Sequence, residues 1–145
     1  MAIQRLEHVG IVVDDLAEAI EFFTALGLEL QGEGSVEGEW AGRIIGLDDV
    51  KTELAMLQAP GGGGQVELVK FLSPPHEGEQ RPEPSNAPGI RHLAFLVDDV
   101  DAVVEGLRAR GTELVGEVVD YKDVYRLCYV RGPAGIIVEL AQELS

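Results

Sequence analysis

Two histidines and two glutamates stand at matched places in two parts of this sequence. His8 and His92 each open an apolar run, and Glu67 and Glu139 each lie inside a later apolar run. Imidazole nitrogen and carboxylate oxygen are ligands of divalent first-row metals. A carboxylate with apolar neighbours is costly to bury unless a positive charge neutralises it. The four residues together therefore predict one divalent metal site, for which Zn, Ni, Co, Mn and Fe are all chemically admissible.

These four ligands indicate a particular chemistry. An octahedral ion that they hold keeps two positions for water or for two adjacent oxygens of a small-molecule substrate. The ion would act as a Lewis acid, while Glu139 or Glu67 takes and returns a proton at the neighbouring carbon. Taken singly, each histidine is explained as a core residue and each glutamate as a solvent-facing one. It is their matched, doubled occurrence that favours the metal.

An internal repeat accounts for the matching. Residues 7–15 and 91–99 align without a gap at an offset of 84 residues, which places His8 on His92 and an Asp-Asp pair on an Asp-Asp pair. The same offset places Glu21 on Glu105 and Gly27 on Gly111. Such self-similarity is the signature of a duplicated structural unit. We therefore expect two copies of one module.

Each copy has the pattern of a strand, a helix, a glycine stop and three more strands. The apolar runs predict the first strands, one aspartate of each pair predicts a helix cap, and Gly27 and Gly111 predict left-handed helix ends. Later strands are expected at residues 28–30, 52–58 and 65–72, and at 112–119, 124–130 and 136–140. The predicted fold class is α+β, with two tandem βαβββ modules.

The modules are expected to form one domain over residues 1–145. Module one covers about residues 1–73 and module two about residues 90–145. A linker at about residues 74–89, rich in proline and charged residues, joins them. Its length allows the modules to pair within one chain or between two chains.

Strand alternation predicts where the four candidate ligands point. Val9, Ile11 and Val13 share one face of the first strand, which leaves His8 on the other face, and the second copy repeats this for His92. In the closing strands, Glu67 and Glu139 lie opposite the apolar faces of Val66 and Val138. All four side chains are therefore expected on the face away from the helices.

These segments resemble the vicinal oxygen chelate superfamily. The resemblance rests on His-Val-Gly-Ile-Val-Val-Asp-Asp, on His-Leu-Ala-Phe-Leu-Val-Asp-Asp and on the two Val-Glu-Leu strands, and it covers nearly the whole chain. The superfamily includes glyoxalase I, methylmalonyl-CoA epimerase, extradiol dioxygenases, fosfomycin-resistance enzymes and bleomycin-binding proteins. The resemblance implies a curved, partly open, barrel-like sheet around the metal, helices outside it, and a homodimer.

Within that superfamily, His8, Glu67, His92 and Glu139 match the ligand set of glyoxalase I. Methylmalonyl-CoA epimerases usually have glutamine where this chain has Glu67. The resemblance implies a lyase or isomerase, of the glyoxalase I or acyl-CoA epimerase kind, acting through an enediolate or enolate. Two alternatives stay open: an Fe(II) extradiol-type dioxygenase using His8, His92 and Glu139, and a drug-sequestering protein of the bleomycin-resistance kind.

The composition excludes other classes of partner. The chain has 26 acidic and 11 basic residues and a formal net charge of −15, so it repels nucleic acid and anionic membranes. Its apolar runs are too short to cross a bilayer, and no export signal is recognised, so we expect a cytoplasmic protein. Cys128 is the one cysteine, and it is interpreted as a small strand residue.

Weaker candidates surround the predicted site. Glu53 is a candidate second base, and His76 is interpreted as a solvated residue of the linker. Candidates for the mouth of the pocket are Trp40, Arg43, Tyr121, Lys122, Tyr125 and Arg126.

Overall fold

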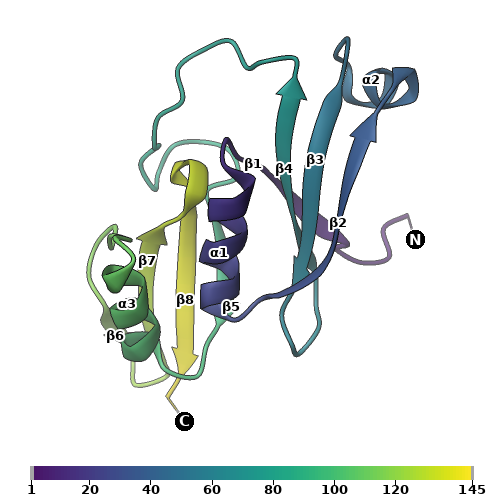
Figure 1. The fold of residues 1–145 in the computed structure, drawn as a ribbon. Helices are drawn as coiled ribbons and strands as arrows, with labels where there is room; N and C mark the ends of the chain where they lie inside the picture. The colour runs from purple at the N-terminus through teal and green to yellow at the C-terminus, as the bar shows by residue number, and fades with distance from the viewer. Residues whose placement is uncertain (1, 145) are drawn as a thin grey trace. The chain divides into compact units, whose positions relative to one another are not determined.

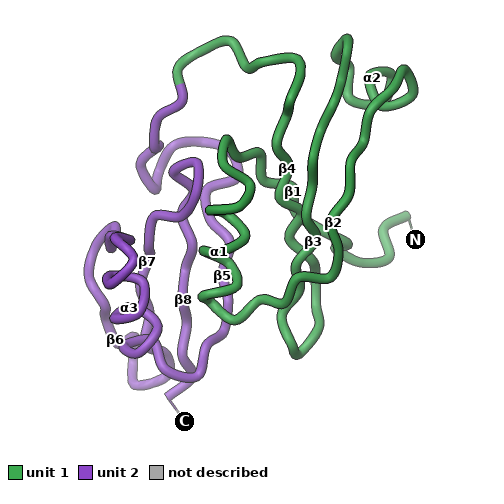
Figure 2. The backbone as a smooth tube through the Cα atoms, viewed as in Figure 1, with its two compact units in different colours: residues 1–79 green, residues 80–145 purple. Residues whose placement is uncertain are grey.

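The computed structural model describes residues 2–144, and these form two compact units. Residues 1–79 make up unit 1 and residues 80–145 make up unit 2 (Figure 2). The boundary lies inside the predicted linker, whose residues form neither helix nor strand. Each unit contains one copy of the sequence repeat.

Unit 1 is a four-stranded mixed sheet with two helices (Figure 1). The sheet order is β1-β4-β3-β2, with β1 parallel to β4 and the other pairs antiparallel. Along the chain its elements are β1 (His8–Val12), α1 (Leu16–Leu26), β2 (Glu29–Glu37), α2 (Glu39–Ile45), β3 (Lys51–Gln58) and β4 (Gln65–Ser73).

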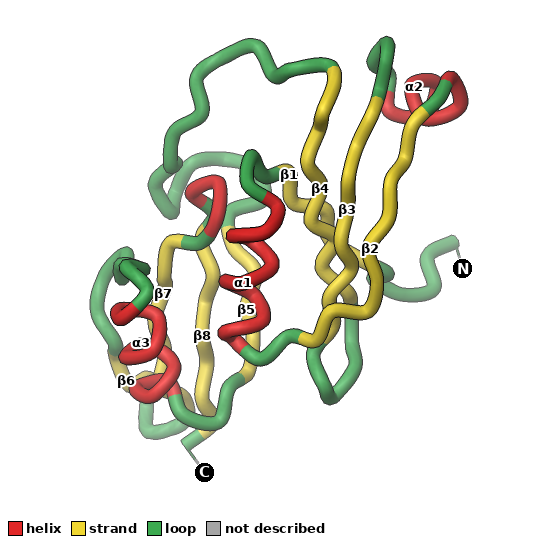
Figure 3. Tube along the Cα trace, in the orientation of Figure 1, coloured by secondary structure: helices red, strands yellow, loops and turns green. Residues whose placement is uncertain are grey.

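Unit 2 repeats this topology (Figure 3). Its sheet order is β5-β8-β7-β6, again with the first and last strands parallel and adjacent. Its elements are β5 (His92–Leu96), α3 (Val100–Ala109), β6 (Val119–Tyr121), β7 (Tyr125–Arg131), the 3₁₀ turn η1 (Pro133–Gly135) and β8 (Ile137–Glu143). The α+β class and the two βαβββ-like modules are confirmed.

Each unit has its own core between one helix and one face of the sheet. In unit 1, α1 packs on β3 and β4, and Phe23, Leu57 and Leu68 are fully buried. In unit 2, α3 packs on β7 and β8, and Leu107 and Leu140 are buried. The helices thus cover one face of each sheet, and the histidine-bearing face lies opposite.

The second aspartate of each Asp-Asp pair caps the following helix. The Asp15 carboxylate accepts a hydrogen bond from the backbone N–H of Glu18 at 3.0 Å, and Asp99 accepts one from Ala102 at 3.1 Å. These bonds satisfy amides that lack partners in the first turn. Gly27 then ends α1 at a φ of 110°, and Gly111 follows α3 at a φ of 89°, as predicted.

Two expectations about local structure were wrong, and one helix was missed. The strand expected at 28–30 continues to Glu37, and α2 was not predicted at all. Nearly all of β2 is exposed, so it lacks the apolar alternation that marks a strand. Its backbone nevertheless pairs with β3 along its length, apart from an irregularity between Leu30 and Gly32. The strand expected at 112–119 is broken, because only an isolated Leu114–Val130 bridge precedes β6.

Two broader expectations have a partial outcome. Both sheets are open within their own units, so no closed barrel forms there. None of the helices within residues 2–144 has the length and apolar character needed to span a membrane.

The cap of α3 should be measurable. Replacing Asp99 by Ala removes a bond to the first turn and should lower the free energy of unfolding by about 1 kcal/mol. Replacing its neighbour Asp98 by Ala should change it by less than about 0.5 kcal/mol, as for an ordinary surface substitution. Urea denaturation followed by circular dichroism measures both. Equal losses in the two variants would contradict the assignment of the cap.

Candidate metal centre

In unit 1, the parallel pairing of β1 with β4 brings His8 near Glu67. The register places His8 against Gln65 and Gly10 against Glu67. The histidine Nε2 lies 4.0 Å from the Glu67 Oε1, and the two side chains are 40% and 26% exposed. Both groups are therefore accessible to an ion or substrate while still covered on most sides.

Unit 2 contains the equivalent pair. The parallel pairing of β5 with β8 places His92 against Ile137 and Ala94 against Glu139. The His92 Nε2 lies 3.4 Å from the Glu139 Oε1, with exposures of 39% and 21%. The predicted matching of the two histidines and two glutamates thus has the same structural basis in each unit.

A second carboxylate orients His8. Its Nδ1 is hydrogen-bonded to the Glu7 carboxylate, which leaves Nε2 directed toward Glu67. The Glu7 hydrogen bond, aided by the charge of Glu67, raises the pKa of His8 above its usual value, and desolvation opposes them. A carboxylate on the far nitrogen of a histidine is the arrangement that commonly fixes a metal-binding imidazole.

An aromatic ring accompanies His92 instead. The rings of His92 and Tyr129 have centroids 5.1 Å apart at an interplanar angle of 37°. Tyr129 is also the strand partner of Glu139, whereas Met56 is the partner of Glu67. The two His–Glu pairs are therefore alike in backbone position and different in their neighbours.

The geometry of each pair fits a shared divalent ion. Two neighbouring ligand atoms at bond lengths of about 2.1 Å lie about 3.0 Å apart around such an ion. The observed separations of 3.4 and 4.0 Å need only small side-chain rotations to reach this value. Within residues 2–144 no three His, Cys, Asp or Glu side chains gather closely enough to hold a metal by themselves.

A pocket of about 340 Å³ lies beside Glu139 in unit 2. Tyr129 and Leu127 of β7 and Val119 of β6 contribute apolar surface to it, and the broken segment before β6 contributes Glu117. The volume is at the lower end of the range for small-molecule sites. Unit 2 therefore places a small cavity next to its His–Glu pair.

Some weaker candidates do not face the site. The Arg126 guanidinium donates to Asp101 on α3 and to Asp120, at 2.9 and 2.7 Å, so it lies on the helix side of β7. Glu53 pairs with Lys70 in the sheet, so it lies on the face opposite Glu67. The mouth role suggested for Arg126 and the base role suggested for Glu53 were therefore wrong.

Two other residues match their interpretations. Cys128 is buried, and burial is the main cause that raises the pKa of its thiol, with the charge of Asp101 adding to it. Such a thiol is a poor nucleophile. His76 lies exposed in the linker.

Sequence reasoning missed Glu7, Tyr129 and Glu117. Glu7 precedes His8 directly, so its proximity was available in the sequence, but its orientation was not. Tyr129 becomes visible only when β7 is registered against β8, and Glu117 only when the broken segment is seen to line the pocket.

The sequence and fold define the family. Residues 5–140 match the Glyoxalase/Bleomycin resistance protein/Dioxygenase superfamily, and the chain belongs to that superfamily. Many members of this superfamily depend on a metal ion.

Three relatives are informative. A glyoxalase family protein from Bacillus cereus has a solved structure with a TM-score of 0.95 and 47% identity, covering 100% of this chain and 99% of that one. The uncharacterized protein YaeR of Escherichia coli is 31% identical over 99% of both chains. A 2-epi-5-epi-valiolone epimerase from Actinomyces sp. is 34% identical over 93% of this chain and 77% of its own.

The Glu7 contact predicts how His8 titrates. Its folded-state pKa is raised, so its contribution to stability is present below the unfolded pKa and is lost as pH rises through the folded pKa. In metal-free protein, Glu7→Gln should lower the pKa of His8, as followed by NMR of the ring protons. Glu37→Gln, on the strand at the other edge of the sheet, should leave it in place. A pKa insensitive to Glu7 would contradict this orientation.

Proposed function

We propose that this protein is a divalent-metal-dependent isomerase or lyase that moves a proton at a carbon next to a carbonyl group. The observation that carries the proposal is the pair of equivalent His–Glu contacts, at 4.0 Å in unit 1 and 3.4 Å in unit 2. The epimerase relative supports the same class, because epimerisation beside a carbonyl requires removal and return of one proton.

His8, Glu67, His92 and Glu139 would together hold one ion, with the two units supplying half of the ligands each. The units that meet would come from one chain or from the two chains of a homodimer. When bound, a divalent ion supplies Lewis-acid polarisation of two adjacent substrate oxygens and so acidifies the neighbouring carbon. Zinc, nickel, cobalt, manganese and iron all suit two imidazoles and two carboxylates.

Glu139 is the stronger candidate for the proton-carrying base. Its carboxylate lines the pocket of unit 2, which gives a substrate a place to bind beside it. A carboxylate there can take the proton from the substrate carbon and return it to that carbon or to its neighbour. Tyr129 packs near His92 and lines the same pocket, so it offers an aromatic surface beside the reacting carbon.

The shared site predicts metal-dependent stability. A metal at a hundredfold excess over its Kd should raise the free energy of unfolding by about 2.7 kcal/mol. His8→Ala and His92→Ala should each lose most of this gain, while their metal-free forms unfold like the wild type. His76→Ala is the matched control and should keep the full gain. The measurement is thermal unfolding with and without Zn²⁺, Ni²⁺ or Mn²⁺. If either site variant kept the gain, the four residues would not share an ion.

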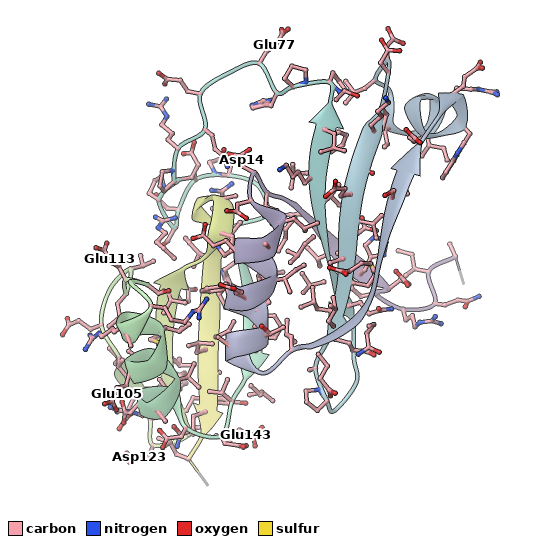
Figure 4. The ribbon with its side chains drawn as sticks, viewed as in Figure 1. Asp14, Glu77, Glu105, Glu113, Asp123 and Glu143 are labelled. Carbon is pink, nitrogen blue, oxygen red and sulfur yellow. The ribbon has the colours of Figure 1, made fainter. Side chains whose placement is uncertain are left out.

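The base assignment predicts a loss of chemistry without loss of metal. In Glu139→Gln the amide oxygen can still bind an ion, but the amide is too weak a base to accept the substrate proton. α-Proton exchange should therefore fall by a factor of about 10² or more. Glu143→Gln, at the exposed end of β8 (Figure 4), should exchange normally. Deuterium uptake into a hemithioacetal, an α-hydroxyketone and a methylmalonyl thioester measures this by NMR.

The same experiment separates the alternatives. Exchange into at least one of these substrates supports the proposed class, and no exchange into any of them by metal-loaded protein rejects it. Oxygen uptake with a catechol that persists in Glu67→Gln would instead identify an Fe(II) dioxygenase. Tight binding of an aromatic drug that a chelator does not change would identify a sequestering protein.

A further inference from the structure

The pocket of unit 2 carries charge of only one sign. Glu117 and Glu139 both belong to its lining, and Ser85 is a neutral polar member of it. No lysine or arginine belongs to that lining in the part of the chain that the structure describes. A negatively charged group of the substrate would therefore meet carboxylates and no compensating cation.

The nearest basic side chains of β7 are occupied elsewhere. Arg126 is bound by Asp101 and Asp120 toward α3. Arg131 donates from its Nη1 to the backbone carbonyl of Gly135 at 2.8 Å. Neither is placed to neutralise an anion beside Glu139.

A bound metal would not change this balance. Two neutral imidazoles and two carboxylates contribute a charge of minus two, which cancels a divalent cation. The loaded centre would then be neutral overall, and the carboxylate of Glu117 would remain as an uncompensated charge at the pocket. The chain as a whole, at −15, repels anions further.

We propose that this pocket binds a substituent of the substrate that carries no negative charge and that Glu117 excludes analogues bearing a carboxylate or phosphate there. The inference rests on the proposed function, since it takes the pocket beside Glu139 as part of the substrate site. The apolar walls of Val119, Leu127 and Tyr129 receive the substituent. A volume of about 340 Å³ holds roughly eleven water molecules, so the substituent is about the size of a substituted ring.

The test uses two probes that differ in charge and hardly in shape: α-hydroxyacetophenone with a para-carboxamide and the same compound with a para-carboxylate. Binding to Zn²⁺-loaded protein is measured by calorimetry. The wild type should bind the amide at least tenfold more tightly than the carboxylate. Raising the ionic strength should shrink this ratio, because salt screens exposed charges.

Glu117→Gln should lower the amide-to-carboxylate ratio to about twofold or less by strengthening carboxylate binding. Glu105→Gln makes the same change of charge on α3 (Figure 4), away from the pocket lining, and should keep the wild-type ratio. Val119→Phe narrows the pocket and should weaken both probes at least tenfold while metal binding is retained.

Several results would overturn the inference: equal binding of the two probes to the wild type, a ratio that Glu117→Gln leaves unchanged, or no binding of either probe. A failure of the proposed function is read separately. Loss of all α-proton exchange with the amide-to-carboxylate ratio intact would reject the isomerase and would still support the exclusion of anions from the pocket. α-Proton exchange together with equal binding of the amide and the carboxylate would support the isomerase and reject the exclusion of anions.

Discussion

The parallel pairing of the first and last strands in each unit is the constraint on which the candidate site depends. Parallel strands need a long connection, and in each unit the helix and the intervening strands provide it. The pairing of β1 with β4 and of β5 with β8 places residues far apart in sequence on neighbouring strands. Because side chains alternate along a strand, one histidine and one glutamate then face the same side, away from the helix. Antiparallel pairing, or a slip of one residue, would separate them.

Duplication has kept this backbone arrangement and changed the surroundings. His8 has a carboxylate from Glu7 on its other ring nitrogen, whereas His92 lies beside the ring of Tyr129. A hydrogen bond to carboxylate restricts the imidazole and makes it a better electron donor. A neighbouring aromatic ring restricts it by packing instead. The two His–Glu pairs have therefore acquired different neighbours.

The acidity of the protein acts at two scales. Over the whole surface, the charge of −15 disfavours polyanions. Near the site, Arg126 is bound by two aspartates and so adds little positive field at the pocket. The electrostatic potential that a substrate meets in the pocket then depends on Glu117 and Glu139 together with any bound ion.

The sequence by itself determined the duplication, the helix caps, the α+β class and the face on which the two histidines lie. These follow from local patterns, since apolar alternation, an Asp cap and a glycine stop each act within a few residues. The tertiary structure alone decided which residues surround the histidines and glutamates. Strand register pairs Tyr129 with Glu139, and it places Glu53 on the sheet face opposite to Glu67. It also shows β2 as a long strand despite its exposed, glycine-rich sequence. An edge strand is held by backbone hydrogen bonds to its neighbour. Because those bonds do not depend on the side chains, they produce no recognisable pattern in the amino-acid sequence.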